Sequence, residues 1–391
     1  MPASTEVKFY RHKMKNAPTV NQNKGTIISL MDAVLVDGFG EATASRVEVT
    51  GNVATVHLAS HGFDKYHVIS ISGATPPQLN GEHRITKVSN DTFQIETVGV
   101  ADGVATGTIK VKVPGAGWKK VARSDDGHKA VYKSTRLGFD QPFYLVEDNE
   151  VGGYGYKVTP LSSFDNFDSY DKSMETQPRT RFPKKGNGST IAWCIVANDH
   201  FVYLMWDNSS YTNNNTFGAY NNGSSSTVVC FGSMKTTKAN NKYNGIVGGL
   251  AATNQTFQTN NPLDTVSWST YCPVSGGPSA SSFITIQKDY TSIGDPVVLW
   301  NGFTNYISAS SGAMFGSINA ADYAIYIQRP LFTSQSVAFG YLPGLYHSPM
   351  SFKPHKTNPV FVDGVSPVKP DNLLIWIPCG GGGVYLNATK W

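Results

Sequence analysis

The sequence predicts a mainly β protein with four parts: an N-terminal arm, one short helix, a small β barrel or sandwich module, and a larger β-rich body. Charged residues make up 15% of the 391 residues, well under the roughly 25% of ordinary soluble domains. Glycine (38 residues) and aromatic side chains (12%) are abundant instead. This composition is typical of many short strands joined by tight turns, and it argues against a helical enzyme. Low charge also suits a surface that meets other proteins, because charge is depleted at the core of interfaces.

Residues 1–24 form a basic arm. Its charged side chains are five cations against Glu6 alone, namely Lys8, Arg11, Lys13, Lys15 and Lys24. The other 27 basic and 27 acidic residues of the chain cancel, so the arm carries the whole net charge of +4. This charge favours docking on an acidic protein surface, whereas five cations are too few to predict a DNA-binding protein. A disordered, solvated tail is the alternative, since termini that nothing holds are usually poorly ordered.

The arm leads into the one convincing helical pattern of the chain. Apolar side chains recur there on a helical period, at Ile27, Leu30, Met31, Val34 and Leu35. We expect Thr26 to be the N-cap and Gly38 to follow the last helical residue. A helix this short needs a partner surface, which is either its own domain or a neighbouring subunit. The second interpretation makes the following residues candidate interface residues: Lys8, Arg11, Lys13, Lys15, Ile27, Leu30, Met31 and Val34.

Residues 41–113 read as the small β module, which together with the arm and helix (1–40) precedes the body. Six short alternating or β-branched runs are separated by turn residues such as Gly51-Asn52, Asn80-Gly81 and Asp102-Gly103. Six strands in about seventy residues predict a small barrel or sandwich.

Residues 114–391 read as the β-rich body, with an internal boundary predicted near the polar stretch 161–190. Two apolar runs flank Asn198-Asp199-His200, which is a strong hairpin signal. A second hairpin is expected at the C-terminal end, around the glycine run Gly380–Gly383. This glycine run lacks the lysine and the following helix of a phosphate-binding loop.

Four stretches resemble a family of tailed-bacteriophage virion structural proteins. They are the run Asn16–Gly40, the module segment His61–Ile109, the central hairpin with Cys230–Met234, and the Gly-x-Leu-Pro-Gly-Leu element Gly340–Leu345. The resemblance implies a structural role in the tail, baseplate or neck, or as a decoration of the head. The asparagine-rich loops at 213–215, 221–222 and 240–241 depart from the family pattern, so loop surfaces that would meet partners are not carried over.

Catalytic motifs are absent from the sequence. It holds no Gly-x-Ser-x-Gly elbow and no His-Glu-x-x-His helix. Glycan hydrolysis would need two carboxylates that face one cleft, and nothing in the sequence pairs the candidates Glu147, Asp148, Asp199 and Asp207. We therefore expect no enzyme, no catalytic residue and no cofactor.

Metal binding is not expected either. The four cysteines form no CxxC pair. The module contains several histidines and an aspartate without a secure i, i+2 or i+4 ligand spacing, namely His57, His61, His67, His83 and Asp64.

The expected partners are other virion proteins and further copies of this chain. Host-surface glycan is the alternative partner, for which Tyr211 and Tyr220 are the candidate binding aromatics because they lie in polar loops. The sequence shows no signal peptide and no transmembrane run, so we expect a soluble protein that is assembled into virions in the host cytoplasm without membrane contact.

Overall fold

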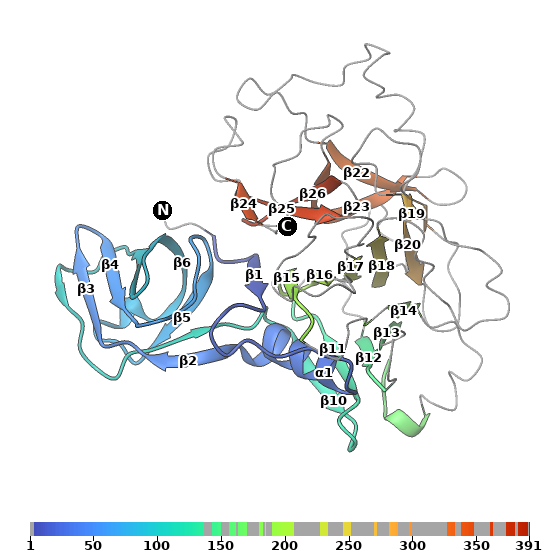
Figure 1. Cartoon of the computed structure of the whole chain (residues 1–391), viewed down its shortest axis with the longest axis horizontal. Helices are drawn as coiled ribbons and strands as arrows, with labels where there is room; N and C mark the ends of the chain where they lie inside the picture. Colours follow the sequence, from blue (N-terminus) through green and yellow to red (C-terminus); the bar gives the residue numbers. More distant parts are fainter. Residues whose placement is uncertain are drawn as a thin grey trace, which may run out of the picture.

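The computed structural model describes residues 4–136, 143–149, 156–161, 163–169, 180–182, 184, 190–206, 227–233, 245–251, 270–271, 281–287, 297–298, 327–332, 338–347, 360–362, 373–379, 382–389 and 391. Its strands form three sheets, of thirteen, eight and five strands. The eight-stranded sheet curls into a half-barrel at one end of the molecule, and the other two sheets lie toward the opposite end (Figure 1). The prediction of a mainly β fold is confirmed.

The thirteen-stranded sheet runs in the order β1-β15-β16-β17-β18-β20-β21-β22-β23-β26-β25-β24, with β19 beside β20. Its pairs are antiparallel apart from the short β19–β20 contact. The strands are β1 (Lys8–Arg11), β15 (Trp193–Ala197), β16 (Phe201–Trp206), β17 (Thr227–Gly232), β18 (Gly245–Ala251), β19 (Thr270–Tyr271), β20 (Ser281–Gln287), β21 (Val297–Val298), β22 (Ile327–Phe332), β23 (Ala338–His347), β24 (Val360–Val362), β25 (Leu374–Cys379) and β26 (Gly382–Asn387).

Both predicted hairpins of the body belong to this sheet. β15 and β16 pair from Trp193↔Trp206 to Ala197↔Val202, and β25 pairs with β26 from Leu374↔Asn387 to Cys379↔Gly382. The Asn198 side chain closes the first turn, because its Oδ1 accepts the N–H groups of His200 (3.1 Å) and Phe201 (2.9 Å). An asparagine that bonds the backbone two and three residues ahead is a common way to stabilise a tight turn.

The eight-stranded sheet runs in the order β2-β9-β5-β6-β7-β4-β3-β8 and lies almost within the range predicted for the module. Its elements are β2 (Phe39–Thr43), β3 (Arg46–Thr50), β4 (Val53–His57), β5 (Val68–Ser72), the 3-10 turn η2 (Pro77–Leu79), β6 (Gly81–Val88), β7 (Thr92–Glu96), β8 (Gly103–Val104) and β9 (Lys110–Val113). The six predicted runs correspond to β3, β4, β5, β6, β7 and β9, while β2 and β8 are additional strands.

Glycine and asparagine residues between His61 and Ile109 fix the loops of this sheet. Gly73 and Gly107 lie so close that a Cβ on Gly107 would overlap the Gly73 carbonyl oxygen. Asn80 donates to the Ala74 carbonyl oxygen and accepts the Ala74 N–H, both at 2.9 Å. The glycines permit close backbone approach and the asparagine closes the loop between β5 and β6.

The five-stranded sheet runs from β10 to β14 in sequence order. Its strands are β10 (Lys119–Arg123), β11 (Lys129–Lys133), β12 (Phe143–Glu147), β13 (Tyr156–Leu161) and β14 (Thr180–Phe182). One face adds Tyr132, Tyr144 and Tyr156 to the main core. On the other face, Val131 and Leu145 join a smaller apolar cluster with Phe164 and Phe167, among others.

The predicted helix is α1 (Thr26–Met31), which continues as the π-helix η1 (Asp32–Asp37). The N-cap is Gly25 in a left-handed conformation (φ 76°), so the prediction of Thr26 is wrong. Thr26 is already helical, and its hydroxyl donates to the carbonyl oxygens of Asn21 and Asn23. Gly38 follows the last helical residue as predicted.

The π-helix is held by the loop that follows β9. Backbone N–H groups of Ala116, Gly117 and Trp118 donate to the carbonyl oxygens of Val34 and Leu35. These bonds satisfy carbonyl groups that a helix end would otherwise leave without partners. The segment after the module is thereby fixed onto the helix that precedes it.

One apolar core runs through the arm, the helix, the module and the first strands of the body, from Tyr10 to Phe231. The boundary predicted at 40 falls inside β2 and that at 113 coincides with the end of β9, and the core crosses both. Among the described residues, no helix has the length and apolar character that a membrane span requires.

Gly115 provides a test of the packing between this loop and the helix. We expect Gly115→Ala to lower the free energy of unfolding by about 3 kcal/mol, because the added Cβ would overlap the Val36 carbonyl oxygen, a backbone atom that cannot rotate away. The control Gly51→Ala has open space around its Cβ and is expected to lose only roughly 1 kcal/mol, from its positive φ. Urea unfolding of both variants measures the difference, and equal losses would contradict the packing.

Candidate functional site

The N-terminal arm is an ordered part of the fold. β1 is the edge strand of the thirteen-stranded sheet and pairs with β15 from Lys8↔Ala197 to Arg11↔Cys194. The arm also buries apolar side chains, namely Val7, Phe9, Tyr10, Met14 and Val20. The alternative of a disordered tail is therefore wrong for residues 4–24, because strand pairing and burial hold them.

Two of the four predicted interface cations of the arm are neutralised by the module. Lys8 Nζ lies 3.1 Å from Glu82 Oε2, and Arg11 Nη1 lies 2.5 Å from Asp64 Oδ2. Lys8 is only 7% exposed. Lys13 and Lys15, by contrast, are exposed and form no ion pair with the described residues. The arm thus has an inner pair of cations that fix it to the module and an outer pair that faces solvent.

The apolar stripe of the helix is not available to a partner. Ile27, Leu30, Met31 and Val34 are all 0% exposed, and they belong to the core of their own chain. The structure therefore corrects the prediction that these four residues form an intersubunit clamp, because the domain's own core covers the stripe.

Arg84 of β6 joins three distant parts of the chain. Its guanidinium donates to four backbone carbonyl oxygens, at distances of 2.7–2.9 Å, of Ser4 and Val7 in the arm, Tyr66 in the module and Ala388 after β26. Arg84 is 6% exposed, and burial lowers the pKa of its guanidinium to about 10, so it remains charged at pH 7. A buried cation is tolerated when its donors are satisfied, and here carbonyl dipoles satisfy them.

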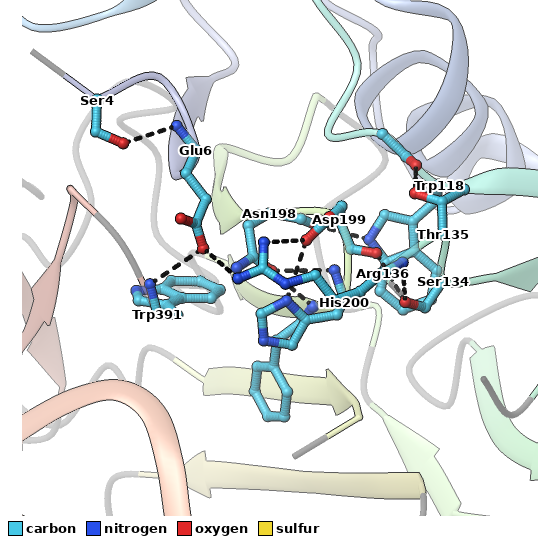
Figure 2. Close-up of polar contacts among 12 residues, drawn as sticks. Ser4, Glu6, Trp118, Ser134, Thr135, Arg136, Asn198, Asp199, His200 and Trp391 are labelled. Atoms are coloured by element: carbon cyan, nitrogen blue, oxygen red, sulfur yellow. Dashed lines mark hydrogen bonds and ion pairs between the residues drawn. The ribbon is translucent and has the colours of Figure 1, made fainter. Parts of the chain in front are cut away.

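A second polar junction joins the arm, the end of β11, the β15–β16 turn and Trp391 (Figure 2). Arg136 Nη2 lies 3.1 Å from Glu6 Oε1, and Arg136 Nη1 lies 3.4 Å from Asp199 Oδ1. The backbone N–H of Trp391 donates to Glu6 Oε1 at 3.4 Å. His200 Nδ1 lies 3.1 Å from Asp199 Oδ1.

The Asp199 carboxylate is held within this junction by Arg136 and His200. Burial raises the pKa of Asp199, but the bond from His200 and the nearby Arg136 outweigh it, and the net pKa lies below the usual value. A carboxylate held by two partners is a poor candidate for a general acid or base, because catalysis needs a pKa close to the working pH.

Of the other carboxylates considered for glycan hydrolysis, Glu147 and Asp148 are enclosed in the fold. Glu147 is fully buried. Asp148 is fully buried as well, where it binds Lys184 Nζ (2.6 Å) and accepts the Ile27 N–H at the start of α1 (2.8 Å). Asp207 lies outside the described residues, as do the candidate binding aromatics Tyr211 and Tyr220.

Two of the module histidines bond backbone N–H groups of their own loop. His61 Nδ1 accepts the Phe63 N–H (3.0 Å), and His67 Nδ1 accepts the Asp64 N–H (2.9 Å). An imidazole whose Nδ1 accepts a hydrogen bond carries its proton on Nε2. Neither ring therefore offers a free lone pair on Nε2 to a metal. Within the part of the chain that the structure describes, no group of three or more His, Cys, Asp or Glu side chains could hold a metal ion.

Sequence reasoning missed the residues that join the distant segments, Arg84, Glu6, Arg136 and Trp391. Arg84 and Ala388 are 304 positions apart, and no local pattern connects them. A possible signal is the single arginine, Arg84, within the strand run Glu82–Ser89. The alternation of this run does not show that Arg84 is buried.

No protein-family model matches the chain, and no curated protein sequence matches it. Among solved structures, a phage phi92 endosialidase aligns with a TM-score of 0.17 and 10% identity, over 89% of this chain and 70% of that chain. At this TM-score the alignment carries no argument about fold or activity.

The Arg84 contacts predict a specific stability effect. We expect Arg84→Met to lower the free energy of unfolding by about 2–4 kcal/mol, because it leaves the buried Val7 and Ala388 carbonyl groups without donors. The control Arg46→Met removes an exposed ion pair with Glu48 and should change stability by about 0.5 kcal/mol or less. Denaturant unfolding compares the two, and similar losses would exclude a role of Arg84 in joining the segments.

The His67 environment predicts an acid-sensitive fold. Burial lowers the pKa of His67 to about 3, so the unfolded chain binds this proton first as pH falls. Stability should fall with pH between about 6.5 and 3, by up to about 1.4 kcal/mol per pH unit from this group. His67→Asn keeps an acceptor for the Asp64 N–H and does not titrate, so its stability should depend less on pH in this window. His57→Asn is the control, and an unchanged slope in the His67 variant would contradict the assignment.

Proposed function

We propose that the chain is a structural component of a tailed-phage virion, assembled in several copies by protein–protein contacts. The mainly β fold and the low charge of the chain support this proposal. The family resemblance of the sequence points to the tail, baseplate or neck, with decoration of the head as the alternative position.

One observation carries the proposal: the four stretches that resemble the phage family are in contact with one another. Trp193 Nε1 donates to the Pro18 carbonyl oxygen (2.9 Å), which joins the arm to the central hairpin. Tyr203 Oη donates to the Pro343 carbonyl oxygen (2.8 Å), which joins this hairpin to the Gly-x-Leu-Pro-Gly-Leu element. Ile27 and Leu30 of the first stretch belong to the same apolar core as Phe63 and Ile69 of the module segment. Residues that resemble one family and are dispersed along the chain thus form one connected unit.

The outer cations of the arm are the contact that we propose for a neighbouring protein. Lys13 and Lys15 are exposed on the turn that directly follows β1, and Met14 between them is buried, so little ordering entropy would be lost when they bind. Two exposed lysines without an ion pair to the described residues favour an acidic protein surface, since complementary charge directs association.

Immunogold electron microscopy of purified virions, with an antibody against this chain, tests the proposal. Label at one locus is the expected result, and it would also identify that locus as neck, tail tip, baseplate or head. Absence of label on both intact and disrupted particles would refute the virion role.

Charge reversal tests the docking contact. We expect Lys13→Glu with Lys15→Glu to reduce incorporation into particles about tenfold or more, since a loss of about 1.4 kcal/mol of binding free energy is a tenfold change. The control Lys87→Glu places the same change on an exposed lysine of the module. Complementation of a phage that lacks the gene, followed by quantitative blotting of particles, measures incorporation. Equal incorporation of both variants would remove Lys13 and Lys15 from the interface.

A further inference from the structure

Lys184 and Asp148 form an ion pair that is enclosed on all sides. Lys184 Nζ lies 2.6 Å from Asp148 Oδ1 and 2.8 Å from Oδ2. Among the ion pairs of the described residues, this is the only one in which both side chains are 0% exposed. Removing two charges from water costs free energy that their mutual attraction often does not repay. The site therefore favours any change that removes both charges together.

The surroundings of the pair match the hydrogen-bonding groups of an amide. Apart from Asp148, Lys184 Nζ has one acceptor, the Asn23 carbonyl oxygen. Apart from Lys184, the Asp148 carboxylate has one donor, the Ile27 N–H, which bonds Oδ2 at 2.8 Å. Among the described residues, Oδ1 bonds Lys184 alone. A secondary amide has one N–H to donate and one carbonyl oxygen to accept, so the site offers one partner for each of these groups.

Burial also shifts both groups toward the forms that react with each other. It raises the pKa of Asp148 and lowers the pKa of Lys184, in each case against the opposing effect of the ion pair. A neutral lysine amine is a nucleophile that attacks carbonyl carbon. A nitrogen within 2.8 Å of both carboxyl oxygens is also close to the carbon that joins them. Reacting groups fixed in this way reach effective molarities of about 10⁵ M or more.

We propose that Lys184 and Asp148 condense to an isopeptide bond within the folded chain. The Lys184 nitrogen bonds to the carboxyl carbon of Asp148, and the bond from this carbon to Oδ1 breaks. Of the three protons of the ammonium group, two leave with Oδ1 as water and one stays on the amide nitrogen. Protons and electrons balance within the pair, so no further reactant is consumed. Oδ2 becomes the amide carbonyl oxygen and keeps the Ile27 N–H, while the amide N–H keeps the Asn23 carbonyl oxygen.

The bond would tie together the segments that meet at the start of α1. Asp148 directly follows β12, and its backbone carbonyl oxygen also accepts the Gly25 N–H (2.9 Å). Lys184 is 36 positions further along the chain. A covalent link between distant residues stabilises a fold mainly by restricting the unfolded chain. This inference concerns the chain itself and does not depend on the proposed role in a virion.

Mass spectrometry of the purified, unmodified full-length chain in denaturant tests the proposal, because an ion pair dissociates there and an isopeptide bond does not. We expect an intact mass lower than the sequence mass by one water molecule. Protease digestion should then release a branched peptide in which Lys184 is joined to Asp148. The full sequence mass would overturn the proposal. So would a loss of water that fragmentation assigns to another position, such as a cyclised Asp102-Gly103 or Asp126-Gly127.

Two controls accompany this measurement. Lys184→Arg keeps the positive charge, but a guanidinium does not lose its proton in proteins and so is not a nucleophile. This variant should have its full sequence mass, and a loss of water that persists in it would refute the assignment. Lys8 and Glu82 are an internal control, because the Glu82 side chain is 35% exposed and that pair should give no branched peptide. The main result comes from the unmodified chain, so it stands whether or not the variant folds.

Discussion

An uncharged, fully buried strand next to the edge strand of a sheet imposes the main constraint on this fold. β15 carries no side chain that would discourage pairing with a foreign strand, so a permanent neighbour has to protect it. The N-terminal arm provides that neighbour as β1. The arm therefore contributes to the core, and removing it would expose β15 as well as delete a docking element. Point substitutions of exposed residues separate these two roles, whereas truncation does not.

The same constraint explains how the arm's charge is distributed. A terminal strand that must stay in place benefits from polar anchors at both ends, and Lys8, Arg11 and Glu6 provide them through partners in the module and the body. Isolated surface ion pairs contribute little stability, but Lys8 is nearly buried and Arg84 adds bonds to the arm's backbone. What remains of the basic excess of the arm, at Lys13, Lys15 and Lys24, is exposed and can meet another molecule.

The sequence was sufficient for the parts of the fold that depend on local patterns. Alternation predicts β3 to β7 and β9, and the turn Asn198-Asp199-His200 predicts the central hairpin. The sequence was insufficient where strand pairing, or contacts between residues far apart in the chain, determine the structure. β8 has two residues, too few to show alternation, and β2 contains Gly40 within Phe39–Thr43. The π-helix shares its apolar stripe with an α-helix, so periodicity does not distinguish them. The helix stripe itself was visible, but not whether the chain's own core or a partner would cover it.

Tyr66 shows how closely the module depends on the arm. It has a positive φ of 73°, which is unfavourable for a bulky side chain and persists only where the surroundings enforce it. The Tyr66 N–H donates to the Ile85 carbonyl oxygen, and the Tyr66 carbonyl oxygen accepts from Arg84, which also binds the arm. The loop that contains Tyr66 meets the arm again at Asp64, through Arg11, and at Gly62, beside Lys15. Loop and arm therefore fix each other's conformation. A partner that recognises Lys13 and Lys15 would bind a surface that exists only while the arm is docked on the module.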